Sequence, residues 1–186
     1  MRGEEAIASL KEFISDDTLI VSSNGNVSRQ AFNFLPQPQV YLRGSMGLPM
    51  SIGLGLALAQ PKKQVLVITG DGNFLMGLSS MTTIGNYKPD NLKIIILDNA
   101  IYATTGGQET VSSTVDYLKL LEGLGIQHYG SLNSIKSPSK LLEAFEIHLT
   151  SKQAAVLHIN VEEDIENLEN IPWQPKEIKS KFMKKI

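Results

Sequence analysis

Cysteine is absent from the sequence. Disulfide bonds, thiolate nucleophiles, cysteine-ligated zinc and iron–sulfur clusters are therefore excluded for this chain. The sequence also lacks an apolar run of about 18 residues, the length that a membrane-spanning helix needs. Its first residues form an amphipathic pattern rather than a signal peptide. The formal net charge is -2, without a long block of like charges, so we expect a cytoplasmic protein with no membrane and no nucleic-acid partner.

The 186 residues fit one domain, 1–186, with a sizeable core. Short apolar runs alternate with stretches of helical periodicity. Strands are expected over 18–23, 64–70, 92–99 and 154–162. Helices are expected over 3–14, 27–35, 51–60, 74–87, 115–125 and 137–150, and a loop over 103–114. Because the central strands are apolar on both faces, the pattern predicts an α/β fold: a three-layer, doubly wound parallel sheet with helices on both faces.

Three polar segments, two of which contain glycine, lie at the ends of predicted strands. They are residues 22–26 (SSNGN), 69–73 (TGDGN) and 97–102 (LDNAIY). In parallel sheets of this kind, ligands bind at the carboxyl ends of the strands. The three segments together are therefore the expected binding site.

Asp71 stands between two glycines where a buried strand ends. This pattern fits an Asx-type turn, and it also fits a ligand of a hard cation beside a closely approaching phosphate. Asn99 ends the next predicted strand and offers a second oxygen. Two oxygen ligands beside a helix N-terminus suit Mg²⁺ with a bound diphosphate. The sequence matches neither the P-loop pattern nor the dinucleotide-binding fingerprint.

The segment from Gly70 to Asn99 resembles the Gly-Asp-Gly…Asn signature of thiamine diphosphate enzymes. Residues 43–61 (RGSMGLPMSIGLGLALAQP) and 102–110 (YATTGGQET) are similar to the sulfopyruvate and phosphonopyruvate decarboxylase group of that family. Residues 23–29 (SNGNVSR) resemble the first strand-end loop of the group. The resemblance covers roughly residues 5 to 162. It implies the thiamine diphosphate-binding fold, with thiamine diphosphate and Mg²⁺ as cofactors.

The resemblance also implies roles for single residues. The Asp71 carboxylate, the Asn99 side chain and the Ile101 carbonyl would bind Mg²⁺. The Gly44 carbonyl would accept a hydrogen bond from the aminopyrimidine, and Met46 would be the apolar wedge that keeps the cofactor bent. Ordinary core packing is the alternative for Met46. The cofactor-binding set as a whole is Asn24, Gly25, Gly44, Ser45, Met46, Gly70, Asp71, Gly72, Asn73, Asn99, Ile101 and Tyr102.

Enzymes of this family combine the diphosphate-binding domain with a second domain that binds the pyrimidine and supplies a glutamate. This chain has room for the first domain alone. The resemblance therefore implies that no catalytic residue lies in this chain and that the glutamate comes from a pyrimidine-binding α-subunit. The expected assembly is at least α2β2, with self-association through this domain.

The implied reaction is decarboxylation of a small 2-keto acid, with 3-sulfopyruvate giving sulfoacetaldehyde and CO₂ as the leading hypothesis. A phosphonopyruvate decarboxylase, an acetolactate synthase-like carboligase subunit and a non-catalytic regulatory module that binds the cofactor are the alternatives. Thr104, Thr105 and Gln108, with the backbone amides of residues 106 and 107, would bind the second anion of the substrate. The other reading is that this loop covers the diphosphate and nothing else.

The remaining polar candidates carry weaker signals. His148 in a predicted helix and His158 in a predicted strand are interpreted as structural, whereas the role of His128 stays open. Arg29 and Arg43 lie near strand-end loops, where each would form a structural pair or face an anion.

The C-terminal segment carries a four-residue apolar repeat. Ile178, Phe182 and Ile186 recur with lysines between them. This pattern predicts a basic amphipathic helix docked at a subunit interface, with binding to a membrane surface as the alternative.

Overall fold

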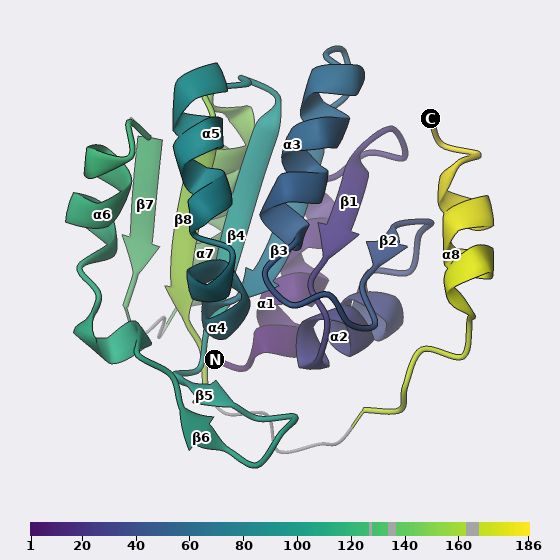
Figure 1. The fold of residues 1–186 in the computed structure, drawn as a ribbon, viewed down its shortest axis with the longest axis horizontal. Helices are drawn as coiled ribbons and strands as arrows, with labels where there is room; N and C mark the ends of the chain where they lie inside the picture. The colour runs from purple at the N-terminus through teal and green to yellow at the C-terminus, as the bar shows by residue number, and fades with distance from the viewer. Residues whose placement is uncertain (127, 134–136, 163–167) are drawn as a thin grey trace.

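The computed structural model describes residues 1–126, 128–133, 137–162 and 168–186. At its centre lies a six-stranded sheet in the order β2-β1-β3-β4-β8-β7 (Figure 1). Each pair of neighbouring strands is parallel. The strands are β1 (Leu19–Ser22), β2 (Val40–Tyr41), β3 (Val65–Gly70), β4 (Leu92–Asp98), β7 (His128–Leu132) and β8 (Ala155–Asn160).

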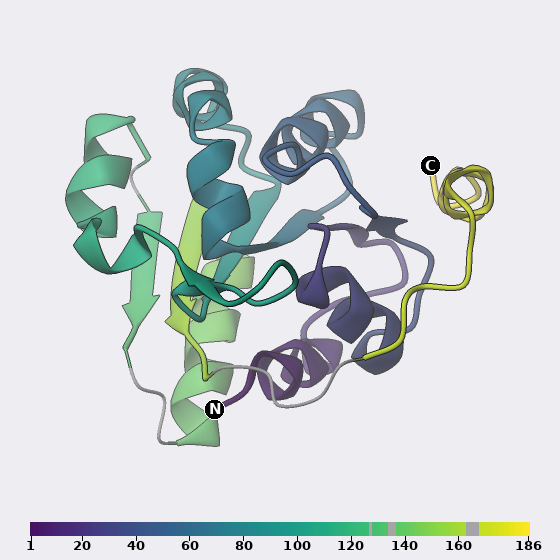
Figure 2. The same cartoon turned by 60° about the horizontal axis from the view of Figure 1, so that its bottom comes forward.

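Helices cover both faces of the sheet (Figures 1 and 2). In β4, Ile94 and Ile96 belong to one apolar cluster, and Ile95 and Leu97 belong to the other. Successive side chains of a strand point to opposite faces, so the apolar middle of this strand is buried from both sides. The predicted three-layer fold is confirmed. One face carries α1 (Gly3–Ser9), α2 (Asn26–Phe34) and α7 (Pro138–Thr150); the other carries α3 (Pro49–Ala59), α4 (Asp71–Met76), α5 (Ser79–Tyr87) and α6 (Tyr117–Gly123).

The single helix expected over 74–87 is wrong. The structure has two helices there, α4 and α5, which are separated at Gly77 and Leu78. Gly77 lies against the backbone of Gly47, and a Cβ built on Gly77 would come within 2.0 Å of the Gly47 oxygen. A residue without a side chain permits this contact, which joins the end of α4 to the loop before α3.

The two edge strands, β2 and β7, were not expected from the sequence. The β7 segment (HYGSL) is polar, and β2 has two residues. Their pairing with β1 and β8 makes them strands, because strand formation depends on neighbours more than on local preference. The loop expected over 103–114 also contains regular structure, namely the 3₁₀ turn η2 (Ser112–Thr114) and the second strand of the hairpin β5 (Ile101–Tyr102)–β6 (Gln108–Glu109).

The C-terminal helix is confirmed as α8 (Pro175–Phe182). It packs on β2 of the same chain through Ile178 and Phe182, which are buried, whereas Ile186 is 42% exposed. The Trp173 ring just before α8 meets Phe32 edge-on at 5.0 Å between ring centroids. α8 therefore covers an edge of the sheet, and a role at a subunit interface stays a prediction. Within the described residues, no helix combines the length and apolar character needed to cross a membrane.

Candidate functional site

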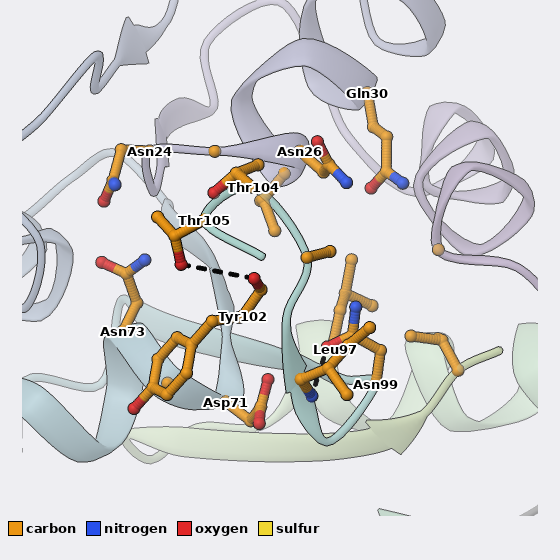
Figure 3. Close-up of a pocket in the computed structure, with 18 of the residues that line it drawn as sticks. Asn24, Asn26, Gln30, Asp71, Asn73, Leu97, Asn99, Tyr102, Thr104 and Thr105 are labelled. Carbon is orange, nitrogen blue, oxygen red and sulfur yellow. Dashed lines mark hydrogen bonds between the residues drawn. The ribbon is translucent and has the colours of Figure 1, made fainter. Parts of the chain in front are cut away.

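An open pocket with a cavity volume of about 150 Å³ lies at the carboxyl ends of β1, β3 and β4 (Figure 3). All three strand-end segments singled out in the sequence line it. The pocket brings together most of the predicted site residues: Asn24, Gly25, Met46, Gly70, Asp71, Gly72, Asn73, Asn99, Ile101, Tyr102, Thr104 and Thr105. Their binding roles stay predictions.

Two helices begin at this pocket. α2 starts after Gly25, whose φ of 83° suits glycine, and α4 starts after Gly70. Among the described residues, neither helix has a side-chain cap at its N-terminus. The first backbone N–H groups of a helix have no partner within the helix. Two uncapped N-termini that open on one pocket make it suitable for an anion with several oxygens.

Asp71 is the buried charge of the pocket, with 2% of its surface exposed. The Thr110 hydroxyl donates a hydrogen bond to its Oδ2. Burial, with a smaller contribution from the nearby Asp98 carboxylate, raises the pKa of the Asp71 carboxyl to about 6, although the hydrogen bond from Thr110 lowers it. Within the described part of the chain, Asp71 has no ion-pair partner. A bound cation would compensate this charge.

Asn99 and Ile101 lie on a tight turn after β4. Ala100 between them has a φ of 59°, a left-handed conformation that is uncommon for residues other than glycine. Asp98 Oδ1 accepts a hydrogen bond from the Ala100 N–H at 2.9 Å, and Asn99 Oδ1 accepts one from the Ile101 N–H at 3.2 Å. Burial works against ionisation of Asp98, but hydrogen bonds from His158 and Ser112 outweigh it and hold the pKa of Asp98 below its ordinary value.

The β5–β6 hairpin folds over the pocket. A Cβ built on Gly72 would lie 2.3 Å from Cε1 of Tyr102, so the tyrosine ring rests directly on the Gly72 backbone. On the other side of the pocket, Thr104 comes within 3.5 Å of a Cβ built on Gly25 (Figure 3). The hairpin thus bridges the β3 end and the β1 end of the site.

The comparisons with known proteins identify the family. A model described as "Thiamine pyrophosphate enzyme, C-terminal TPP binding domain" matches residues 23–159. The chain belongs to this family. It is 36% identical over 183 residues to the sulfopyruvate decarboxylase subunit beta of Methanococcus maripaludis, which covers 98% of this chain and 96% of the relative. It is 33% identical over 159 residues to the phosphonopyruvate decarboxylase of Streptomyces viridochromogenes, which covers 83% of this chain and 39% of that relative.

Solved structures support the same fold. An X-ray structure of a provisionally assigned thiamin diphosphate-dependent enzyme from Mycobacterium smegmatis superposes with a TM-score of 0.74. The match covers 88% of this chain and 32% of that one, at 19% sequence identity. The likeness confirms the thiamine diphosphate-binding fold predicted from the sequence.

The residues of this thiamine pyrophosphate-binding domain fit the diphosphate and metal end of the cofactor. The buried Asn24 Oδ1 has no hydrogen-bond partner among the described residues, so the Asn24 amide faces the pocket with unused capacity. The two uncapped helix N-termini suit the diphosphate, and the Asp71 carboxylate suits a hard cation. The described residues contain no group of three or more His, Cys, Asp or Glu side chains arranged for a metal. The set implied by the family resemblance completes Asp71 with an amide oxygen, from Asn99, and a backbone carbonyl, from Ile101.

Three predicted residues lie outside this pocket. Gly44 and Ser45 are exposed and line a second cavity, between β2 and α8. Gln108 is exposed on the hairpin and contacts Thr105. Met46, by contrast, reaches the pocket, and its loop is tied to α4 because Asn73 Oδ1 accepts a hydrogen bond from the Gly47 N–H at 3.0 Å.

Sequence reasoning missed the residues behind the pocket. Thr110 contacts Asp71, and Ser112 and His158 contact Asp98. The signal was weak: residues 109–114 (ETVSST) read as a plain polar loop.

The other polar candidates have structural contacts. His148 and His158 are buried in α7 and β8, as expected. The Arg29 Nη1 donates to the Leu168 carbonyl and the Arg43 Nη1 to the Trp173 carbonyl, each at 3.2 Å. The side chain of His128 lies outside the described part of the structure, so its role stays open.

Proposed function

We propose that this chain is the β-subunit of a thiamine diphosphate- and Mg²⁺-dependent sulfopyruvate decarboxylase. The observation that carries the proposal is the match to a β-subunit of that name, at 36% identity over nearly the whole of both chains. The strand-end pocket supports it, because its oxygen donors and helix N-termini suit a metal diphosphate.

In this proposal the Asp71 carboxylate, the Asn99 side chain and the Ile101 carbonyl hold Mg²⁺. Asn24, Gly25 and Asn73 contact the diphosphate. When bound, thiamine diphosphate supplies the electron sink that decarboxylation of a 2-keto acid needs. The chain itself binds the cofactor, orients it through the Met46 wedge, and excludes water under the Tyr102–Thr105 end of the hairpin.

The acid–base glutamate comes from a pyrimidine-binding α-subunit. The name of the relative, subunit beta, supports a second chain type. We propose an assembly of at least α2β2, in which the two chain types form the active site together.

The test is reconstitution. The chain is purified together with a pyrimidine-binding α-subunit from the same organism, and CO₂ release from sulfopyruvate is measured with thiamine diphosphate and Mg²⁺. We expect release that stops when the metal is chelated, and that Asp71→Ala abolishes. A folded complex that releases no CO₂ from any 2-keto acid overturns the proposal. A partner whose activity is indifferent to Asp71→Ala points instead to a non-catalytic module.

Phosphonopyruvate is the second candidate substrate. The match to a phosphonopyruvate decarboxylase over 83% of this chain favours it, and both substrates carry a second anion that Thr104 and Thr105 at the pocket mouth could bind. The ratio of kcat/KM for the two substrates in the reconstituted complex decides between them. A carboligase would reveal itself by a carbon–carbon bonded product in place of free aldehyde.

A further inference from the structure

Two buried carboxylates lie at the ends of adjacent strands, Asp71 after β3 and Asp98 at the end of β4. One short segment beyond the hairpin supplies a hydroxyl to each of them. Thr110 donates to Asp71 Oδ2, and Ser112 donates to Asp98 Oδ2. The Ser112 N–H also donates to Thr110 Oγ1 at 3.3 Å. The two carboxylates are thus joined through neighbouring residues of one segment.

The same segment fixes the turn that carries Asn99 and Ile101. The Ala100 N–H donates to Asp98 Oδ1 at 2.9 Å, and the Ala100 carbonyl accepts from the Thr110 N–H at 2.8 Å. Both backbone polar groups of this left-handed residue are therefore engaged. Unfavourable backbone conformations persist where the surroundings over-determine them, and here the surroundings are Asp98 and Thr110.

Buried side chains hold this network from behind. His158 Nε2 donates to Asp98 Oδ2 at 2.7 Å, because an ionised carboxylate can only accept. Ser112 Oγ lies 2.6 Å from the Tyr117 hydroxyl, and the Tyr117 ring stacks on His158 at 4.2 Å between centroids. None of the residues in this network behind the pocket lines the pocket, and each is at most 8% exposed: Asp98, Ser112, Tyr117 and His158.

We propose that Thr110, Ser112 and Asp98 are positioning residues for the Mg²⁺ ligands of the proposed site. Thr110 orients the Asp71 carboxylate, and Ser112 with Asp98 holds the Asn99–Ile101 turn. This inference rests on the proposed function. Residues that orient metal ligands from behind alter metal affinity by about 10- to 100-fold without touching the metal.

The experiment measures Mn²⁺ binding by the full-length chain in complex with its pyrimidine-binding α-subunit, in the presence of thiamine diphosphate. Free Mn²⁺ is followed by its electron paramagnetic resonance signal. Thr110→Val, which keeps the side-chain shape and removes the hydroxyl, and Ser112→Ala are each expected to raise the Kd for Mn²⁺ about 10-fold or more. Thr110→Ser keeps the hydroxyl and should restore the Kd to within about threefold of the wild-type value.

Ser131→Ala is the matched control. Ser131 Oγ lies 3.4 Å from His158 Nδ1, on the side of the ring away from Asp98, and it donates to Asn133. This variant makes the same Ser→Ala change at the border of the network. Within the described part of the chain, the Ser131 hydroxyl bonds to His158 and Asn133 and not to the Ala100 turn, so the Kd should stay at the wild-type value. Circular dichroism identifies the temperatures at which each variant is folded, and each titration is carried out within that range.

The measurements distinguish the proposed metal site from the proposed positioning residues. Mn²⁺ uptake by the wild type that depends on thiamine diphosphate and is lost in Asp71→Ala supports the metal site, and its absence overturns that site. Once uptake is established, wild-type Kd values for Thr110→Val and Ser112→Ala overturn the positioning roles. A purely structural role would lower the melting temperature of these variants and leave the Kd of the folded protein unchanged. If Thr110→Val does not fold, the Ser112→Ala and Ser131→Ala pair decides alone.

Discussion

The two sides of the predicted site are built differently. We call Asp71 and the Asn99–Ile101 turn the floor, and residues 43–47 the rim loop. The floor is held by buried hydroxyls and backbone bonds from Thr110 and Asp98. In the rim loop, Gly44 and Ser45 are exposed, and Ser45 has a φ of 59°.

This difference accords with the division of labour in the proposed function. A site for a metal and a diphosphate has to be ready before they bind, because loosely held ligands lose affinity to conformational entropy. A rim that a second chain completes can stay open. The chain therefore organises the end proposed for the metal by itself and leaves the end proposed for the aminopyrimidine exposed.

The helix α4 begins at Asp71 of the floor and ends just before Gly77, which contacts Gly47 of the rim loop. Gly77→Ala should break this contact between the two sides. The new Cβ would meet the Gly47 oxygen at 2.0 Å and the Met50 side chain at 2.5 Å. Because the nearest atom is backbone, relief requires the loop to move. We expect a loss of about 3 kcal/mol or more in the free energy of unfolding, measured by urea denaturation.

Gly55→Ala is the control for that substitution. Gly55 lies in α3 with nothing within 4 Å of a built Cβ, so alanine should stabilise the chain by up to about 1 kcal/mol. Equal stability of the Gly77→Ala and Gly55→Ala variants would show that the floor and rim loop are not joined at Gly77.

Asp71→Asn should stabilise the metal-free chain. Burial raises the pKa of Asp71 from 3.8 to about 6, so the folded state holds a proton that the unfolded state releases between these values. Stability contributed by the neutral form is therefore lost as the pH rises from about 4 to about 6, and the loss is constant above that range. Asparagine has no charge to bury, and we expect a gain of about 2 kcal/mol at neutral pH.

Urea denaturation in the presence of a chelator, at neutral pH and again near pH 4, measures this gain. It should shrink to a small part of its neutral-pH value at the lower pH, where the folded wild type carries the proton and the unfolded chain carries it in about half of the molecules. A gain in stability that does not depend on pH would mean that burial of the Asp71 charge is not what destabilises the wild-type chain. The same variant should bind Mn²⁺ more weakly, which sets stability against function at this position.

Trp173→Ala should loosen the rim side and leave the floor intact. Trp173 packs on Phe32, and its carbonyl accepts a hydrogen bond from Arg43, the first residue of the rim loop. The ring is partly exposed, so we expect a loss of about 1–2 kcal/mol, less than for a fully buried tryptophan. Hydrogen exchange should quicken in α8 and β2 and stay slow in β3 and β4. Faster exchange throughout the sheet would mean that the two sides unfold together.

The sequence predicted the floor better than its supports. Asp71 and Asn99 follow long apolar strands, and the carboxyl ends of adjacent parallel strands meet at one edge of a sheet. The strand pattern alone therefore brought them together. The family resemblance then placed Ile101 and Met46 in the same pocket.

The supports could not be predicted, because their partners are distant in sequence and carry no periodic signal. Ser112 meets Asp98, and Thr110 meets Asp71, across a hairpin whose fold was not expected. Gly44 and Ser45 were placed in the site by motif, yet this chain alone turns them towards α8. The sequence did not predict the edge strands β2 and β7 for a related reason. Pairing with the neighbouring strands, rather than their own composition, makes these segments strands.

Gly44→Ala should have the smallest effect on the isolated chain. Nothing lies within 4 Å of a Cβ built on Gly44, and its backbone is not in the left-handed region. We expect a change in the free energy of unfolding of at most about 0.5 kcal/mol. Gly72→Ala is the matched change next to Asp71 of the floor. The new Cβ would meet the Tyr102 ring at 2.3 Å, and the variant should lose about 1–3 kcal/mol of stability. Equal losses for the two variants would contradict an open rim, because Gly44 would then be packed as tightly as the floor.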